Sequence, residues 1–318
     1  MDIMAVVDKM LAGDQAMLAK VITRIEREDG VVPEIMKRIY PRAGKAYTIG
    51  VTGPPGGGKS TLVDKLVSLL RQKDFTVGVV AVDPTSPFSG GAILGDRIRM
   101  QRHYLDEGVF IRSMASRGSF GGLAMATKDV VTALDAFGKD FVIVETVGVG
   151  QTELDIINRV DTTLVILIPG AGDAIQTMKA GLMEIADIFV VNKADQPGTE
   201  NTINDLESML SLHPAASGWD VPVISTQAHN NIGIEDLFQQ IERHRTFLTE
   251  RGQLNARREQ RRKNDFLMAI QDRAKRQLQK HIERDGELSA IMERVARGEL
   301  DPHSGAIEVF NTLGLLNE

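Results

Sequence analysis

The stretch GPPGGGKST, residues Gly53–Thr61, decides the fold. It matches the pattern G-x-x-x-x-G-K-[ST] and lies between an apolar run, YTIGVT, and a helical pattern, STLVDKLVSLL, which is the context that this pattern requires. Glycines allow successive backbone N–H groups to turn toward phosphate oxygens, and the N-terminus of the next helix adds its dipole. The stretch therefore predicts a phosphate-binding loop; the alternative is an ordinary glycine-rich turn between a strand and a helix.

Two residues of this loop have separate predicted roles. Lys59 should reach the β- and γ-phosphates of a nucleoside triphosphate, and the Ser60 hydroxyl should bind Mg²⁺. The predicted nucleotide-binding residues of the loop are Gly53, Pro54, Pro55, Gly56, Gly57, Gly58, Lys59, Ser60 and Thr61. The loop alone does not choose between ATP and GTP.

Apolar runs that read as strands recur along the chain, with helical patterns between most of them. The predicted strands span residues 47–53, 77–83, 109–114, 141–146, 162–170, 187–193 and 221–226. Strands that alternate with helices indicate a mostly parallel sheet covered by helices on both faces. The predicted fold class is therefore α/β, built around the phosphate-binding loop.

The two ends of the chain lack such strands. Apolar residues at helical spacing predict a helical N-terminal segment over 1–44, followed by a nucleotide-binding domain over 45–248 and a C-terminal helical arm over 249–318. The arm carries an apolar stripe: Phe266, Leu267, Ile270, Ala274, Leu278 and Ile282. A stripe of this kind needs a partner surface, which is either the core of the same chain or a second subunit.

Charge and composition exclude several classes of protein. The formal net charge of −6 argues against a general nucleic-acid binder, and the absence of cysteine excludes disulfides, thiol catalysis and cysteine metal sites. Residues 242–284 nevertheless hold thirteen Lys/Arg against six Asp/Glu, which indicates either a solvated helix face or an acidic partner. No early segment resembles a signal peptide, and no apolar run approaches the roughly 20 residues that cross a bilayer. We expect a soluble cytoplasmic protein with no membrane contact.

The segment VVNKAD, Val190–Asp195, predicts guanine as the base. The Asp195 carboxylate can accept hydrogen bonds from N1–H and the N2 amine of guanine, whereas adenine offers an acceptor at N1 and has no N2 amine. A site whose polar groups are left unpaired rejects the wrong ligand strongly. Asn192 should brace the loop, and the stem of Lys193 should lie along the base.

A second guanine loop is predicted in STQAHNNIG, Ser225–Gly233. The residues assigned to it are Gln227, Ala228 and His229. The backbone N–H of Ala228 can bind the guanine O6, because that contact requires no particular side chain. An ordinary turn is the alternative.

The segment FVIVETVGVGQTELD places Glu145 at the end of a predicted strand and Gly148 three residues later. A carboxylate at this position can bind Mg²⁺ through water or orient the attacking water, and the Gly148 N–H can hydrogen-bond a γ-phosphate. A helix cap or a surface acid is the alternative for Glu145. The six histidines show no paired metal spacing, so surface or packing roles are expected for them.

These motifs, taken with the long segment DPTSPFSGGAILGDR, Asp83–Arg97, and with GDAIQTMKAGLMEIAD further on, occur in an order that resembles the MeaB/ArgK family. Its members are dimeric G-protein chaperones of adenosylcobalamin-dependent methylmalonyl-CoA mutase and related acyl-CoA mutases. The resemblance covers nearly the whole chain. It departs from the family pattern at Gln227, where guanine loops typically read Ser-Ala.

The resemblance implies further roles. The segment 83–97 matches switch I, with Asp83 and Asp96 near Mg²⁺, and residues 145–153 match switch II. GAGDAIQTMKAG, residues 170–181, matches a third switch in which Asp173 and Lys179 relay the nucleotide state to the mutase. The family also implies a homodimer formed through the C-terminal arm and no B12 bound by this chain itself.

The predicted function is a Mg²⁺-dependent GTP-hydrolysing switch that acts as a metallochaperone, gating cofactor loading or protection in an acyl-CoA mutase. The predicted catalytic residues are Lys59, Glu145, Asp83 and Asp96, and the predicted metal ligands are Ser60, Asp83, Asp96 and Glu145. No glutamine is an obvious choice to position the attacking water, so turnover should be slow. Arg117 is a candidate arginine acting in cis, or else a surface residue.

Two other functions remain open on sequence grounds. A P-loop kinase linked to arginine or ornithine transport is the first, but such kinases rarely carry a guanine-selecting N-K-x-D. A dimeric ATPase of the partition type is the second. Those ATPases place another lysine early in the phosphate loop, where this chain has Pro54.

Overall fold

The computed structural model describes residues 2–84, 100–116, 122–146, 160–170, 182–212 and 218–314. The chain divides into two compact units, residues 1–254 and 255–318. The first contains the sheet and the N-terminal helices, and the second contains most of the C-terminal helical segment. Each unit is described separately.

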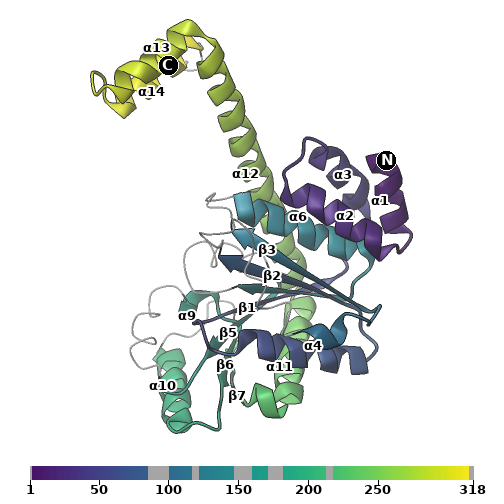
Figure 1. The fold of residues 1–318 in the computed structure, drawn as a ribbon. Helices are drawn as coiled ribbons and strands as arrows, with labels where there is room; N and C mark the ends of the chain where they lie inside the picture. Colours follow the sequence, from purple (N-terminus) through teal and green to yellow (C-terminus); the bar gives the residue numbers. More distant parts are fainter. Residues whose placement is uncertain are drawn as a thin grey trace. The chain divides into compact units, whose positions relative to one another are not determined.

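A seven-stranded sheet forms the centre of the first unit, and all of its strand pairs are parallel (Figure 1). The strands are β1 (Tyr47–Thr52), β2 (Val77–Pro84), β3 (Val109–Ser116), β4 (Phe141–Thr146), β5 (Thr162–Leu167), β6 (Ile188–Asn192) and β7 (Val223–Thr226). Their order is β3-β2-β4-β1-β5-β6-β7, so β1 lies between β4 and β5. Strands β2 and β3 are added on one side of β1, and β5, β6 and β7 on the other, so the order in which strands are added reverses at β1. Ligands of open parallel sheets bind at such a point, outside the carboxyl ends of the strands.

The strands confirm the seven apolar runs predicted from sequence. Strands β1, β4, β5 and β6 are buried throughout, which is why apolar residues lie on both of their faces rather than on one. The predicted strand 162–170 is shorter in the structure, because Pro169 and Gly170 form a turn in which Gly170 has a φ of 77°. Proline lacks the N–H that a parallel ladder requires, so β5 ends before it.

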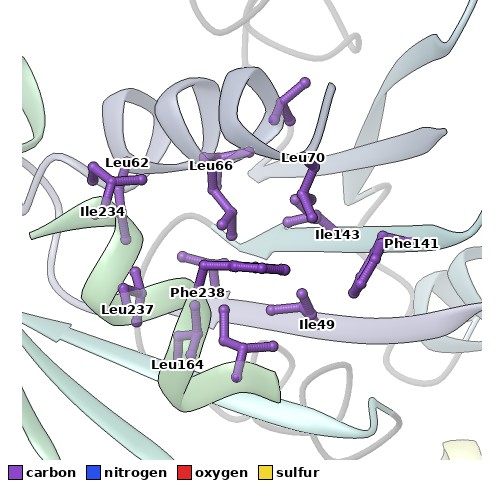
Figure 2. Packing of buried hydrophobic residues seen from close by; sticks show 14 of the residues in the cluster. Ile49, Leu62, Leu66, Leu70, Phe141, Ile143, Leu164, Ile234, Leu237 and Phe238 are labelled. Atoms are coloured by element: carbon purple, nitrogen blue, oxygen red, sulfur yellow. The ribbon is translucent and has the colours of Figure 1, made fainter. Parts of the chain in front are cut away.

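Helices cover both faces of the sheet. Helices α4 (Lys59–Gln72) and α11 (Ile234–Glu250) lie on one face, where Leu66 and Phe238 point toward Ile143 and Leu164 of the strands (Figure 2). Helix α6 (Gly122–Phe137) lies on the other face. This unit also contains helix α10 (Thr199–Leu212) and the short elements η1 (Tyr40–Arg42), η2 (Gln101–His103), α9 (Leu182–Ile185) and η3 (Ala228–Asn230).

The N-terminal segment forms three helices, α1 (Ile3–Leu11), α2 (Gln15–Glu26) and α3 (Val32–Ile39). The carboxylates of Asp2 and Asp14 accept hydrogen bonds from backbone N–H groups in the first turns of α1 and α2. These caps fix where the two helices begin. The apolar faces of all three helices share one core with α6 and with strands β2 and β4. This segment is therefore part of the same compact unit as the sheet.

Helix α12 spans Gln253–Arg284, and its residues from Asn255 onward belong to the second unit. This unit also contains α13 (Gly286–Ala296) and α14 (Pro302–Thr312). Its small core contains Leu288, Ile291 and Val309, against which Leu278 and Ile282 of α12 pack. The other end of the predicted stripe is exposed in this chain: Phe266 is 65%, Leu267 56% and Ile270 48% accessible. Among the residues that the structure describes, no helix is both long and apolar enough to cross a membrane.

Candidate nucleotide-binding site

The phosphate-binding loop connects the carboxyl end of β1 to the first residue of α4. Gly53, Gly56 and Gly58 have φ values of 146°, 74° and 83°, which side chains rarely tolerate. A Cβ on Gly58 would also collide with the side-chain amide of Asn192, and one on Gly53 with the carbonyl oxygen of Ile166. The loop therefore needs glycine at all three positions for its backbone conformation, and at Gly53 and Gly58 for close contacts as well.

Lys59 lies inside this loop. Its side chain is buried, and Nζ donates hydrogen bonds to the carbonyl oxygens of Gly53 (2.8 Å) and Pro54 (2.9 Å). The loop thus encloses a cation at the N-terminus of a helix, and both features favour an anion. This geometry suits the predicted contact between Lys59 and nucleotide phosphates.

Two of the predicted metal ligands are in direct contact. The Ser60 hydroxyl donates to Oε1 of Glu145 over 2.6 Å, and both residues are buried, Glu145 to 1% exposure. A hydroxyl oxygen beside a carboxylate is the kind of hard oxygen pair that Mg²⁺ prefers. Within the described ranges, no group of three or more acidic or histidine side chains gathers in a way that could hold a metal. Ser60 and Glu145 therefore fit Mg²⁺ as part of a site.

Asn192, the last residue of β6, links three loops. Its Nδ2 donates to the carbonyl oxygen of Gly57 (2.9 Å), and its Oδ1 accepts from the Thr226 hydroxyl (3.0 Å) and from the Ala228 N–H (3.1 Å). Asn192 is 2% exposed. The bracing role predicted for Asn192 is compatible with this geometry, and the side chain joins the phosphate-binding loop to both loops assigned to the base.

Asp195 follows Asn192 in an exposed turn. The turn is fixed by Lys193, whose φ is 57°, and by a hydrogen bond from the Ala194 N–H to the Thr226 carbonyl oxygen (3.0 Å). No described residue forms a hydrogen bond or ion pair with the Asp195 carboxylate. This carboxylate is consequently available for an external donor, as base recognition requires.

The loop after β7 is closed by its own hydrogen bonds. The N–H of Gln227 donates to the Ile232 carbonyl (3.1 Å), the reverse bond measures 3.3 Å, and Asn230 Nδ2 donates to Gln227 Oε1 (3.0 Å). The Gln227 side chain therefore supports the loop, which explains how glutamine is accommodated here. His229 is exposed. The Ala228 N–H donates to Asn192, so its predicted contact with guanine O6 stays a prediction and would share that hydrogen.

Several predicted site residues cannot be placed in this way. The backbone of Asp83 lies at the end of β2, paired in register with Ala115, but its side chain lies outside the described residues. Five further residues lie entirely outside the described residues: Asp96, Gly148, Asp173, Lys179 and Arg117. Their predicted roles stay predictions.

One hydrogen bond near the site was not predicted from the sequence. The Thr146 hydroxyl donates to the Thr52 hydroxyl over 3.1 Å, and both are fully buried at the carboxyl ends of β4 and β1. Threonine is common in strands, so nothing in the sequence distinguished this pair. It joins the strand that precedes the phosphate-binding loop to the strand that carries Glu145.

A seven-stranded parallel sheet, a glycine loop enclosing Lys59 at its central strand, and an N-K-x-D turn tied to that loop define a P-loop GTPase. The chain belongs to the family described as methylmalonyl-CoA mutase-associated GTPase MeaB, whose model matches residues 18–283.

Individual relatives agree with this assignment. A protein of Pyrococcus abyssi is 48% identical over 303 residues, which cover 94% of this chain and 93% of that protein. The GTPase ArgK of Escherichia coli is 37% identical over 260 residues, 79% of this chain and 78% of that one. The solved structure of a LAO/AO transport system kinase superposes with a TM-score of 0.71 at 26% identity, covering 98% of this chain and 97% of that chain.

Proposed function

We propose that this GTPase is a Mg²⁺-dependent switch that serves an adenosylcobalamin-dependent acyl-CoA mutase of the methylmalonyl-CoA type. The observation that carries the proposal is the family match over residues 18–283, because the description of that family names methylmalonyl-CoA mutase. A mouse protein described as the methylmalonic aciduria type A homolog adds support, at 28% identity over 93% of this chain and 76% of that protein. In this proposal the chain acts in the cytoplasm and binds no B12 itself.

The hydrolytic step draws on residues at the carboxyl end of the sheet. Mg²⁺, when bound, neutralises charge on the β- and γ-phosphates. Lys59 leaves the carbonyl oxygens of Gly53 and Pro54 to contact the phosphates and stabilises the charge that develops as water attacks the γ-phosphorus and the bond to the β–γ bridging oxygen breaks. Ser60 and Glu145 would hold the Mg²⁺ ion through their side-chain oxygens. GDP and inorganic phosphate are the products.

The output of such a switch is a change in the loops around the γ-phosphate. In the proposal, segments 83–97, 145–153 and 170–181 respond to the nucleotide, with Asp83 and Asp96 near the metal and Gly148 near the γ-phosphate. Asp173 and Lys179 then pass the nucleotide state to the mutase, which gates the loading or protection of its cofactor.

Nucleotide-dependent retention of a mutase tests the proposal directly. The full chain, immobilised and loaded with GDP or with a non-hydrolysable GTP analogue, is expected to retain purified methylmalonyl-CoA mutase to different extents in the two states. The readout is the amount of mutase eluted, with a cobalamin-independent acyl-CoA enzyme as the matched control. Equal, background-level retention in both states from protein that still hydrolyses GTP would refute the mutase role and leave the GTPase intact.

A kinase linked to amino-acid transport is the second candidate, because the superposed solved structure carries that description. The two functions differ in the fate of the γ-phosphate. A switch releases it as inorganic phosphate at the same rate with or without arginine or ornithine, whereas a kinase transfers it to an acceptor. Labelled γ-phosphate followed in the presence of either amino acid separates the two.

We also propose a homodimer formed through the C-terminal arm, residues 249–318. Phe266, Leu267 and Ile270 give α12 an exposed apolar face that a second copy would cover. A chain that ends after Leu254 keeps the buried Leu248 and the whole of α11, so its first unit should remain folded. We expect this truncated chain, and full-length Ile270→Glu, to sediment as monomers while the wild type sediments as a dimer.

The dimer proposal has a clear contrary result. If the truncated chain still sediments as a dimer, the arm is not the interface. Met292→Glu, which replaces a half-exposed residue of α13, is a matched control for adding a charge outside the α12 face.

A further inference from the structure

Helix α4 carries a buried carboxylate that the nucleotide site, as described above, does not use. Asp64 lies one turn after Ser60 on this helix, among the buried side chains of Val63, Leu66 and Val67, and is 8% exposed. Aspartate is a poor helix former, and burying its charge is costly unless the carboxylate is fully paired. Its neighbours must therefore offset that cost.

Arg102 and His103 provide the pairing. Both belong to η2, which begins one residue after Met100, where the described chain resumes beyond residue 99. Arg102 holds both carboxylate oxygens of Asp64, with Nε 2.8 Å from Oδ1 and Nη2 at Oδ2. Arg102 Nη2 also donates to the Asp64 carbonyl oxygen over 3.1 Å. A bidentate pair of this kind fixes orientation as well as distance.

His103 approaches the same carboxylate from within the core. Its ring is 7% exposed, and Nε2 lies 3.1 Å from Asp64 Oδ1 and 3.4 Å from the Ser68 hydroxyl. Burial opposes ionisation of Asp64, but the hydrogen bonds from His103 and Arg102 outweigh it and hold the pKa of this carboxyl below its usual range. Met100, immediately before η2, is fully buried in the same core. The residues that follow segment 85–99 are thus fastened to α4 by charge and by packing.

Ser60 and Asp64 lie four residues apart on α4. Residues four apart on a helix lie on the same face, about one 5.4 Å turn apart. Ser60 contacts Glu145, two residues before segment 147–159, and Asp64 contacts the turn directly after segment 85–99. The helix that leaves the phosphate-binding loop therefore contacts residues that begin or follow two of the three segments assigned to a nucleotide-responsive role, 145–153 and 83–97.

We propose that Asp64, with Arg102 and His103, is a positioning residue for GTP hydrolysis, because it fixes residues 100–103, which follow segment 83–97 in the sequence, to the P-loop helix one turn from Ser60. The inference rests on the proposed function, in which segment 83–97 responds to the γ-phosphate. Asp64 lies outside the loop assigned to the phosphates, and it is not one of the residues assigned to the metal. Its effect is to keep residues 100–103 at a constant distance from the phosphate-binding loop, which gives the chain that follows the segment a fixed attachment point.

A second ion pair between the same parts of the chain supplies a matched control. Arg71, at the far end of α4, pairs with Asp106 over 2.9 Å, and Asp106 also accepts the Gly108 N–H over 2.8 Å. The pair joins α4 to the residues that follow η2, but lies about three turns from Ser60. Loss of the Asp106 charge should therefore lower stability without altering the chemistry.

The test compares Asp64→Asn, Arg102→Gln, their double variant and the control Asp106→Asn in the full-length protein. The kcat and KM for GTP, the Kd for GDP and the thermal midpoint are measured for each. We expect Asp64→Asn to lower kcat about tenfold, since small displacements remote from the chemistry have effects of this order or larger, with the Kd for GDP changed less than about twofold. The double variant should resemble the single variants, because the two residues act as one unit.

Asp106→Asn separates positioning from stability. We expect its kcat to stay within about twofold of wild type, even where its thermal midpoint falls as far as that of Asp64→Asn. Equal kcat for the two variants, or parallel losses of GDP and GTP affinity in Asp64→Asn, would overturn the proposal. If Asp64→Asn does not fold, His103→Gln, which keeps the Arg102–Asp64 pair, is measured against the same criteria. These results concern intrinsic hydrolysis, so they stand apart from any failure to retain the mutase.

Discussion

Asp195→Asn should change the preferred base of the protein from guanine to xanthine. The carboxylate of Asp195 accepts from N1–H and the N2 amine of guanine, whereas an asparagine amide presents one acceptor and one donor. Xanthine has an oxygen at C2 in place of the amine, so it matches that amide. A polar mismatch of this kind costs several orders of magnitude in discrimination, and we expect GTP affinity to fall about a hundredfold or more.

The structure indicates that this change leaves the fold undisturbed. Asp195 is exposed in the turn after β6, and no described residue depends on its carboxylate, so the substitution unpairs no protein group. Asn192, which holds the turn to the phosphate-binding loop, is unchanged. The thermal midpoint of the nucleotide-free variant should therefore equal that of the wild type.

Competition binding measures the result, with GTP, XTP and ATP titrated against a fluorescent guanine nucleotide and hydrolysis of each followed separately. Asp205→Asn, an exposed residue of α10, is the control for loss of one charge. An Asp195→Asn protein that keeps its guanine preference would show that this carboxylate does not read the base.

The fold follows from sequence to a large degree because the central strands β1, β4, β5 and β6 are buried on both faces. Such strands are rich in apolar residues on both faces, so runs such as VGVVAV and FVIV are visible without knowledge of what they pair with. The N-terminal helices were visible for a related reason, since Val6, Val7 and Met10 repeat at the helical period and all three are buried. Strand order is not visible in this way, because it depends on contacts between distant segments.

The site was predictable where a short motif carries the chemistry and not where distant residues meet. Lys59 and Asp195 follow from local patterns. The contacts of Asn192 with Gly57, 135 residues away, and of Ser60 with Glu145, 85 residues away, depend on how the strands are ordered. The buried ion pair of Asp64 could not be predicted from sequence, because a single acidic residue on an apolar helix face does not indicate which distant residues pair with it.

Lys59→Ala should have the largest effect on hydrolysis of any single change in the chain. The buried ammonium of Lys59 is held by Gly53 and Pro54 in the loop that is predicted to receive the phosphates. Removing one preorganised donor from a developing anion costs about 10²–10³ in rate, and Lys59 supplies a full positive charge as well. We expect kcat for GTP to fall by at least about 10³. Lys59→Arg should not restore it, because a planar guanidinium cannot occupy a site built for a compact ammonium.

Stability should respond in a different way from activity, and this makes the prediction specific. Lys59 is the first residue of α4, where a positive charge is opposed by the helix dipole, so its loss removes an unfavourable term along with two hydrogen bonds. The free energy of unfolding of the nucleotide-free variant should therefore lie within about 1 kcal/mol of that of the wild type. Lys65→Ala, on the same helix but outside the loop, is the control and should hydrolyse GTP normally. If Lys59→Ala retained hydrolysis within about tenfold of that control, Lys59 would be a structural part of the loop, and the charge on the phosphates would have to be met by other groups.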